Sequence, residues 1–224
     1  LCFLLRNVDV TTALLRDHIH HTGLHGQSKH MGIYHALQKL AEQGEDVPQF
    51  GGPWFNSTMQ EDLICVNITR AAANAADRAQ LTQAECRMRE DAYKLVALLR
   101  KLYPEFAKAS IAEIAAQGGV RETYHIRGLY TLSGADILGG APCADGVAFC
   151  SHPVDIHSAQ DNTQTAQYFD TPCPVPYRVM VAAGFDNLIA AGRCVSCVDE
   201  AYASMRVQGT CMAIGEAAGV AAAM

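Results

Sequence analysis

The chain has 224 residues, 50% of them hydrophobic, with 17 basic and 23 acidic side chains and a formal net charge of −6 at pH 7. This length is enough to bury a sizeable core in one large domain or two small ones. The acidic balance and the lack of a long basic run argue against nucleic acid as a partner. The longest nearly apolar stretch, Met212 to Met224, spans roughly 13 residues where a membrane span needs about 20, so we expect a core helix and no membrane anchor.

The nine cysteines are odd in number and scattered along the chain. This pattern predicts free thiols in a reducing cytoplasm, because a small disulfide scaffold uses an even and more regular set. No targeting peptide is visible. Leu1 is not an initiator methionine and Met224 lies inside an apolar helix, so we expect residues beyond both ends or on another chain.

The first third of the chain predicts a strand over residues 1–10, a helix over about 13–21 and a second helix over 29–43. A loop dense in Gly and Pro follows, and apolar runs at 54–55 and 63–68 predict strands. His21 and His25 have the i, i+4 spacing of a metal-binding pair on a helix. Because Gly23 and Gly26 interrupt that helix, we interpret the region as a solvated connection without a metal. This histidine-rich region holds six of the nine histidines: His18, His20, His21, His25, His30 and His35.

Three capping boxes predict the starts of helices in the middle of the chain. The box from Thr82 to Glu85 begins a long helix that ends before Pro104, and the box from Ser110 to Glu113 begins a shorter one. Ser133 to Asp136 begins a third, short helix. Extended segments are predicted at 147–150, 154–157 and 177–181, with a polar insertion at 158–171. In the segment 154–157, Asp155 and His157 share one face. They either support acid–base chemistry or hold the following loop.

Val120 to Leu132 predicts a strand with four polar side chains on one face, because alternate residues of a strand point the same way. Arg121 and His125 on that face suit a carboxylate-bearing or electron-rich substrate, with proton transfer by His125. The alternative is that Arg121 pairs with Glu122 or another carboxylate at a domain junction. The four side chains are those of Arg121, Thr123, His125 and Arg127.

The last part of the chain predicts a buried strand over 187–191, a turn at Gly192 and a final helix rich in Ala and Gly. So many small residues predict close packing against another backbone, and an exposed apolar helix face in the chain alone. The first turn of this helix, at Gly209 and Thr210, has N–H groups and a positive dipole end that favour an anion or an electron-rich carbonyl.

The segment NLIAAGRC from Asn187, followed after a loop by SMRVQGTCMAIGEAAGVAAA, resembles the carboxyl-terminal signature of bacterial FAD-dependent oxidoreductases with a glutathione-reductase-type flavin domain. Further blocks agree with this family in the same order: NITR at 67–70, LTQAE at 81–85, GVRET at 119–123, GLYTL at 128–132, DIH at 155–157 and PYR at 176–178. The resemblance implies FAD as cofactor and a small-molecule substrate. It also implies a mixed α/β fold, in which residues 1–175 form a substrate-side domain and residues 176–224 complete a Rossmann-like FAD-binding domain.

The resemblance further implies roles for individual residues. Gly192 would let the backbone approach the cofactor, and Arg193 would meet its pyrophosphate or ribityl region. Arg206 would stabilise negative charge at one edge of the flavin ring, together with the N–H groups around Gly209, Thr210 and Cys211. Arg121 and His125 would act on the substrate side.

The sequence contains no GxGxxG turn of the kind that holds the FAD pyrophosphate in this family. We therefore expect about half of a flavoenzyme, completed by a longer chain, by a flavin-domain partner or in a homo-oligomer, and weak or no FAD binding by residues 1–224 alone. One alternative is a non-catalytic subunit that docks on a flavin-domain partner. Another is thiol redox chemistry at Cys194 and Cys197, which form a CxxC.

Overall fold

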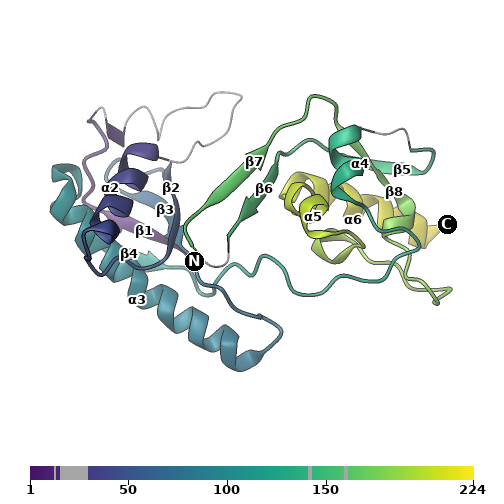
Figure 1. The fold of residues 1–224 in the computed structure, drawn as a ribbon, viewed down its shortest axis with the longest axis horizontal. Coiled ribbons are helices and arrows are strands. Elements are labelled where there is room, and N and C mark those ends of the chain that lie inside the picture. Colours follow the sequence, from purple (N-terminus) through teal and green to yellow (C-terminus); the bar gives the residue numbers. More distant parts are fainter. Residues whose placement is uncertain (13, 16–29, 141–142, 159–160) are drawn as a thin grey trace. The chain divides into compact units, whose positions relative to one another are not determined.

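The computed structural model describes residues 1–12, 14–15, 30–140, 143–158 and 161–224 (Figure 1). The chain divides into two compact units, which we describe separately. Unit 1 comprises Leu1–Gly119 with Ala159–Asn162, and unit 2 comprises Val120–Ser158 with Thr163–Met224. The described residues form five α-helices and three small antiparallel sheets, which confirms the mixed α/β class. The assignment of 1–175 to a substrate-side domain and of 176–224 to a flavin domain stays a prediction.

Unit 1 is built on a four-stranded antiparallel sheet in the order β2-β3-β1-β4. Its strands are β1 (Cys2–Arg6), β2 (Phe50–Ser57), β3 (Ile64–Thr69) and β4 (Ser110–Ile114). Strand β1 lies in the interior, pairing Phe3 with Val66 of β3 and with Ile114 of β4. Alternation decides which side chains are buried: Phe3 and Leu5 enter the core, while Leu4 between them is only partly buried.

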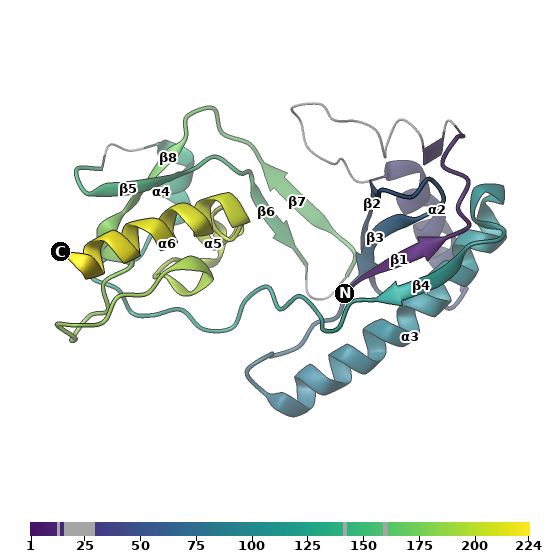
Figure 2. The same cartoon turned by 180° about the vertical axis from the view of Figure 1, so that it is seen from behind.

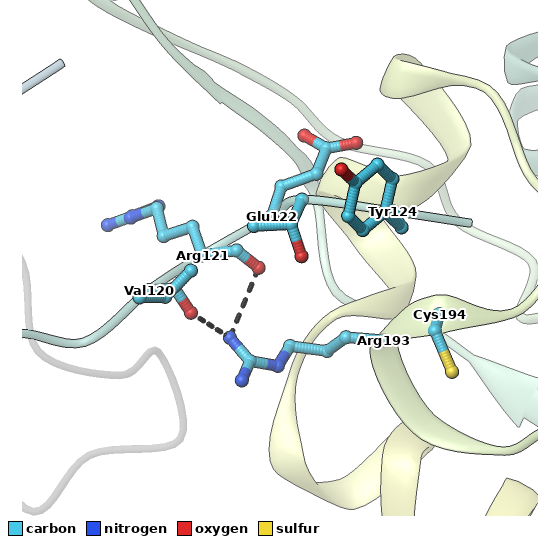
Figure 3. Close-up of a pocket in the computed structure, with 7 residues that line it drawn as sticks. Val120, Arg121, Glu122, Tyr124, Arg193 and Cys194 are labelled. Atoms are coloured by element: carbon cyan, nitrogen blue, oxygen red, sulfur yellow. Dashed lines mark hydrogen bonds between the residues drawn. The ribbon is translucent and has the colours of Figure 1, made fainter. Parts of the chain in front are cut away.

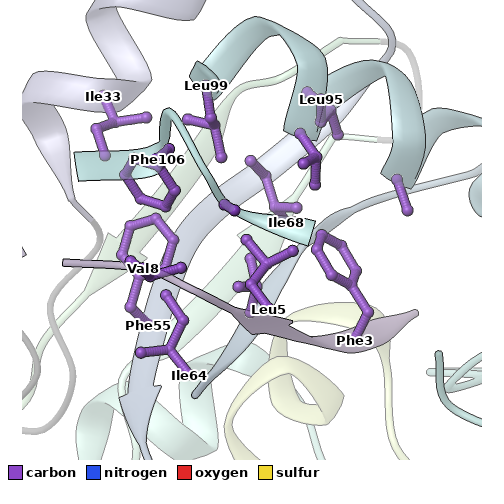
Figure 4. Packing of buried hydrophobic residues seen from close by; sticks show 14 of the residues in the cluster. Phe3, Leu5, Val8, Ile33, Phe55, Ile64, Ile68, Leu95, Leu99 and Phe106 are labelled. Carbon is purple, nitrogen blue, oxygen red and sulfur yellow. The ribbon is translucent and has the colours of Figure 1, made fainter. Parts of the chain in front are cut away.

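Two helices, α2 (Met31–Glu42) and α3 (Arg78–Leu102), pack with this sheet around one hydrophobic core. Apolar side chains at helical spacing in α3 supply one side of the core. Helix α2 begins at His30, whose Nδ1 accepts from the Ile33 N–H at 3.2 Å. Figure 4 shows the packing of Phe3, Leu5, Val8, Ile33, Phe55, Ile64, Ile68, Leu95, Leu99 and Phe106.

The histidine-rich region lies largely outside the described residues: His18, His20, His21 and His25 all do. His30 caps α2, as described above, and its Nε2 lies 2.9 Å from the Leu14 carbonyl oxygen. Among the residues that the structure does describe, no group of three or more potential ligands is placed to hold a metal ion.

The first two capping boxes differ from expectation in different ways. Helix α3 forms as predicted but begins earlier, because the Asp77 carboxylate caps it by accepting from the Ala79 N–H at 2.8 Å. Thr82 instead donates back to the Arg78 carbonyl within the helix at 2.8 Å. The predicted helix at Ser110 is wrong, since these residues form β4, which pairs along β1. Pairing with a neighbouring strand satisfies the same backbone groups that a local helix would satisfy.

Unit 2 contains two two-stranded antiparallel sheets, three α-helices and short 3₁₀ turns among its described residues. One sheet pairs β5 (Gly146–Cys150) with β8 (Cys173–Pro176), and the other pairs β6 (Val154–His157) with β7 (Gln164–Gln167). The helices are α4 (Gly134–Gly139), α5 (Asp199–Met205) and α6 (Gln208–Ala223). The 3₁₀ turns include η2 (Tyr177–Val179) and η3 (Gly192–Cys194). The capping box at the start of α4 is confirmed, with the side chain of Ser133 accepting from the Asp136 N–H.

Three predicted strands of unit 2 are absent from its described residues. Residues 120–132 form an extended segment with bridges only at Gly128 and Leu132, and residues 177–181 begin with the η2 turn. Residues 187–191 are half-buried or exposed and form one bridge, between Ile189 and Val181. Each segment has strand-like residues, but none has a continuous neighbouring strand to complete a ladder.

The final helix, α6, runs beside β5 (Figure 2) and buries mainly Thr210 and Ile214. Its opposite face is open, because Met212 is 73% and Val220 is 57% exposed. A Cβ added at Gly215 or Gly219 would meet no described atom within 4 Å. The expected exposed apolar face is therefore present, and within the described part of the chain the small residues are packed only on the other side, where Ala213, Ala217 and Ala218 lie partly buried against the core of unit 2. No helix in the described ranges has the length and apolarity to cross a membrane.

Candidate functional site

A pocket of about 270 Å³ in unit 2 lies between residues 120–124 and η3. Nη1 of Arg193 donates to the Arg121 carbonyl oxygen at 3.1 Å and also to the Val120 carbonyl oxygen (Figure 3). Arg193 thus binds the backbone of the neighbouring segment and closes one side of the pocket. The thiol of Cys194, also in the lining, is exposed.

His125 is the most firmly held ionisable side chain near this pocket. Its Nδ1 lies 2.9 Å from the Val195 carbonyl oxygen, and its Nε2 lies 2.7 Å from Oε1 of Glu122. The ring also makes an edge contact with Tyr202, with centroids 5.2 Å apart. Because a carbonyl oxygen only accepts, Nδ1 is the donor to Val195, which leaves Nε2 as the nitrogen that faces Glu122.

Arg121 and His125 come from the extended segment that replaces the predicted strand, so a regular alternation does not place them. The backbone of Arg121 is tied to Arg193, and its side chain extends away from Tyr124 (Figure 3). Both residues remain near the pocket, but their shared face does not follow from a sheet. Their roles toward a substrate stay a prediction.

The residues predicted to approach a cofactor fall into two places. Helix α6 packs against η3, and the Cys211 thiol lies near Arg193, whose charge opposes the rise that burial gives the pKa of that thiol. Gly192 has a φ of +78°, a left-handed conformation that favours glycine. The N-cap of α6 makes no side-chain hydrogen bond to the first turn, so the N–H groups of Gly209 and Thr210 can meet an external acceptor, whereas the Cys211 N–H donates to the Val207 carbonyl oxygen at 3.0 Å.

Arg206, the remaining predicted cofactor residue, lies in a different network. It donates to Oδ2 of Asp155 at 2.7 Å, and the same oxygen accepts from Nε2 of His157 at 2.8 Å. Burial alone would raise the pKa of Asp155. However, the hydrogen bond and charge of His157, with the Gln164 amide and Arg206, hold that pKa well below its usual range. This network holds the β6–β7 hairpin to the end of α5.

The two cysteines of the CxxC differ in environment. Cys194 is exposed and its thiol lies 3.4 Å from the Ala191 carbonyl oxygen, whereas Cys197 is buried 3.7 Å from Nδ1 of His125. Burial raises the pKa of the Cys197 thiol to about 12. A thiol held in its protonated form is a poor nucleophile, so these contacts do not favour an active dithiol.

The residues predicted to approach the cofactor fit part of an FAD molecule. The first turn of α6 and the left-handed Gly192 offer N–H groups and close approach to an anionic or electron-rich group. A Cβ at Gly209 would meet no described atom within 4 Å, so this end of the helix has open space in front of it. The pocket of about 270 Å³ lies below the roughly 300–1,000 Å³ of sites that enclose a drug-sized ligand, so it suits one portion of a dinucleotide.

Two important neighbours of His125 were not singled out from the sequence. Glu122 was considered only as a partner for Arg121, and Tyr202 was not considered. The i, i+3 spacing of Glu122 and His125 is a weak signal, because it brings the two side chains together only in a bent or helical backbone. The position of Tyr202 against the imidazole depends on how α5 packs.

A family model described as FAD dependent oxidoreductase matches residues 1–224, the whole chain. No curated protein and no solved structure gave a significant match.

Proposed function

Because the chain belongs to the FAD-dependent oxidoreductase family, we propose that it supplies the cofactor-facing and substrate-facing residues of an enzyme that oxidises or reduces a small molecule. The observation that carries this proposal is the uncapped first turn of α6, a helix that packs against η3, whose Arg193 and Cys194 line the pocket. In this proposal residues 176–224 belong to a Rossmann-like flavin domain and residues 1–175 to the substrate side.

The proposed cofactor contacts are made by backbone groups and one guanidinium. The first-turn N–H groups of Gly209 and Thr210 would bind an electron-rich edge of the flavin, with Cys211 following them in the helix and Gly192 allowing close approach. Arg193 would add positive charge while it keeps residues 120 and 121 in place. Arg206 would act indirectly, by holding Asp155 and the β6–β7 hairpin.

The proposed acid–base group is His125, supported by Glu122. The bound flavin would supply hydride or electron transfer, and the protein would position it and handle the accompanying proton. The Val195 carbonyl keeps the proton on Nδ1, so Nε2 is the position that gains or loses a proton. Glu122, which is half-exposed, would stabilise the protonated ring and release Nε2 when its side chain turns toward solvent.

Fluorescence titration with FAD, FMN and ADP tests the cofactor assignment. The proposed contacts address the flavin end of FAD, so FMN should bind within about tenfold of the FAD affinity and should compete with FAD. ADP, which has no flavin, should not compete at similar concentrations. Failure of both flavins to bind once the flavin domain is completed, by a longer chain or by its partner, would contradict the proposal. If ADP competed as strongly as FMN, the proposed residues would instead contact the adenosine end of FAD.

The exposed face of α6 favours a second reading, in which the chain docks on a flavin-domain partner or on its own copy. Met212 and Val220 project from this face, and both are large apolar side chains. Sedimentation of the purified chain over a range of concentrations tests self-association. If Met212→Asp disperses an oligomer that the wild type forms, the face is an interface between copies. A monomer at all concentrations would contradict self-association.

A further inference from the structure

Two buried cysteines face each other across the β5–β8 sheet. The register pairs Cys150 of β5 directly with Cys173 of β8. Directly opposed residues of antiparallel strands have Cα atoms about 4.5–5.5 Å apart and side chains on the same face. Disulfides join Cα atoms roughly 4.4–6.8 Å apart, so the backbone already holds this pair at bonding separation.

The two thiols are neighbours that influence each other's pKa, and Sγ of Cys173 donates to the Asp136 carbonyl oxygen at 3.3 Å. Both are free thiols, 0% and 2% exposed. Ligand chemistry other than a disulfide is not favoured here, because in the described part of the chain no third Cys, His, Asp or Glu joins them in a group that could hold a metal. From this placement we propose that Cys150 and Cys173 form a reversible intramolecular disulfide on exposure to a low-molecular-weight disulfide, of which oxidised glutathione is an example.

The reaction is gated by opening of the sheet. Burial raises the pKa of both thiols, that of Cys173 to about 12, so neither is reactive while the strands are paired. A two-stranded sheet is only marginally stable by itself, and the outer side of β5 is poorly covered, with Phe149 68% exposed. Local separation of β5 and β8 exposes both thiols to water at once, which permits attack by a thiolate on oxidised glutathione.

The exchange proceeds in two steps. One cysteine loses its proton to solvent and its thiolate attacks a sulfur of oxidised glutathione, breaking that S–S bond and releasing one molecule of glutathione as thiolate. The other cysteine, also as a thiolate, attacks the protein sulfur of the mixed disulfide and releases the second glutathione. The protein loses two electrons, and oxidised glutathione gains them as two thiols.

The disulfide would covalently tie β5 to β8 beneath α6. Helix α6 packs on β5, and Cys173 also lies 3.3 Å from the Asp136 carbonyl oxygen at the α4 helix. A cross-link here holds one side of the unit 2 core closed, because it prevents the opening that exposed the thiols. This inference does not depend on flavin binding.

The test is incubation of the folded protein with oxidised glutathione, followed by alkylation in denaturant and peptide mass spectrometry. The expected product is a peptide pair joined through Cys150 and Cys173, with intact mass lower by two hydrogens and reversible by dithiothreitol. The rate of cross-linking should rise at least severalfold in urea below the unfolding transition, because opening limits it. The apparent Tm of the oxidised protein should rise by several degrees.

Matched variants separate this pairing from others. Cys150→Val should abolish the cross-link and leave at most a mixed disulfide on Cys173. Cys86→Ser, which alters an exposed cysteine on α3, should leave the cross-link intact. A disulfide between Cys143 and Cys173 would overturn the proposal. It would also be overturned if Cys150 and Cys173 both remained alkylatable after oxidation under conditions in which Cys194 is fully glutathionylated.

Discussion

Gly209→Asp places a negative charge at the first turn of α6, where the proposal puts the electron-rich edge of the flavin. Gly209 is the second residue of the helix, and a Cβ there would meet no described atom within 4 Å. The new side chain therefore fits without displacing its neighbours. Gly215→Asp is the matched control, because it makes the same replacement at an equally open position two turns further along the helix.

The expected effects on stability and on flavin binding have opposite signs. A carboxylate at a helix N-terminus stabilises the helix by about 0.3–1 kcal/mol, and replacing glycine within a helix adds a few tenths. Gly209→Asp should therefore be as stable as the wild type or slightly more stable. The same carboxylate cancels the positive helix end and repels an anionic ligand, which should cost about 1–2 kcal/mol of binding. That corresponds to a loss of flavin affinity of about 5–30-fold.

The assay pairs fluorescence titration with flavin and thermal unfolding of the same preparations. Gly209→Asp should lose affinity without losing stability, while Gly215→Asp should keep its affinity. Equal flavin affinity in the two variants would refute the assignment of the α6 first turn. If the Tm of Gly209→Asp also fell, unfolding of the variant would instead explain its weaker flavin binding.

In an active preparation, His125→Gln should slow flavin reduction by about 10²–10⁴-fold with unchanged flavin content, while His35→Gln on the surface of α2 should have no effect. Burial raises the pKa of Asp91, which is 5% exposed, so its contribution to stability is greatest at acid pH and is lost as pH rises through that pKa. Asp91→Asn should therefore stabilise the protein at pH 7 by about 1 kcal/mol, with the gain vanishing toward pH 3 in urea titrations, whereas the exposed Asp46→Asn should gain nothing. The pKa of Asp155 is lowered instead, so its contribution is present at neutral pH and disappears as pH falls below about 4. Asp155→Asn should cost roughly 3 kcal/mol at pH 7, and a cost as large at pH 2 as at pH 7 would contradict the ion-pair account.

Helices with complete local signals were predictable from the sequence. The box at Ser133 supplies both of its hydrogen bonds within four residues, and the apolar spacing of α3 defines a buried face without reference to other elements. In both cases the stabilising groups are neighbours along the chain. The start of α3 was less predictable, because Asp77 and Thr82 are both of residue types that cap helices. In the structure Asp77 is the cap and accepts from a first-turn N–H, whereas Thr82 lies inside the helix and donates to the Arg78 carbonyl oxygen.

Strands were less predictable, because a strand exists only where another strand completes its hydrogen bonds. Residues 187–191 are as apolar as many strands, yet they find only one bridging partner. Residues 110–113 carry a good capping box, yet β1 lies beside them and forms β4. Residue pattern alone does not contain the position of that neighbour.

For the candidate site, the sequence by itself determined which residue types stand near the final helix and, through the resemblance, the flavin family. Only the tertiary structure decided that η3 packs beside the first turn of α6, that Arg206 binds Asp155, and that Glu122 and the Val195 carbonyl hold His125. These contacts join segments far apart in sequence or depend on a bend in an irregular backbone. Such geometry leaves no periodic signal, because it is set by how the elements pack and not by the spacing of residues along the chain.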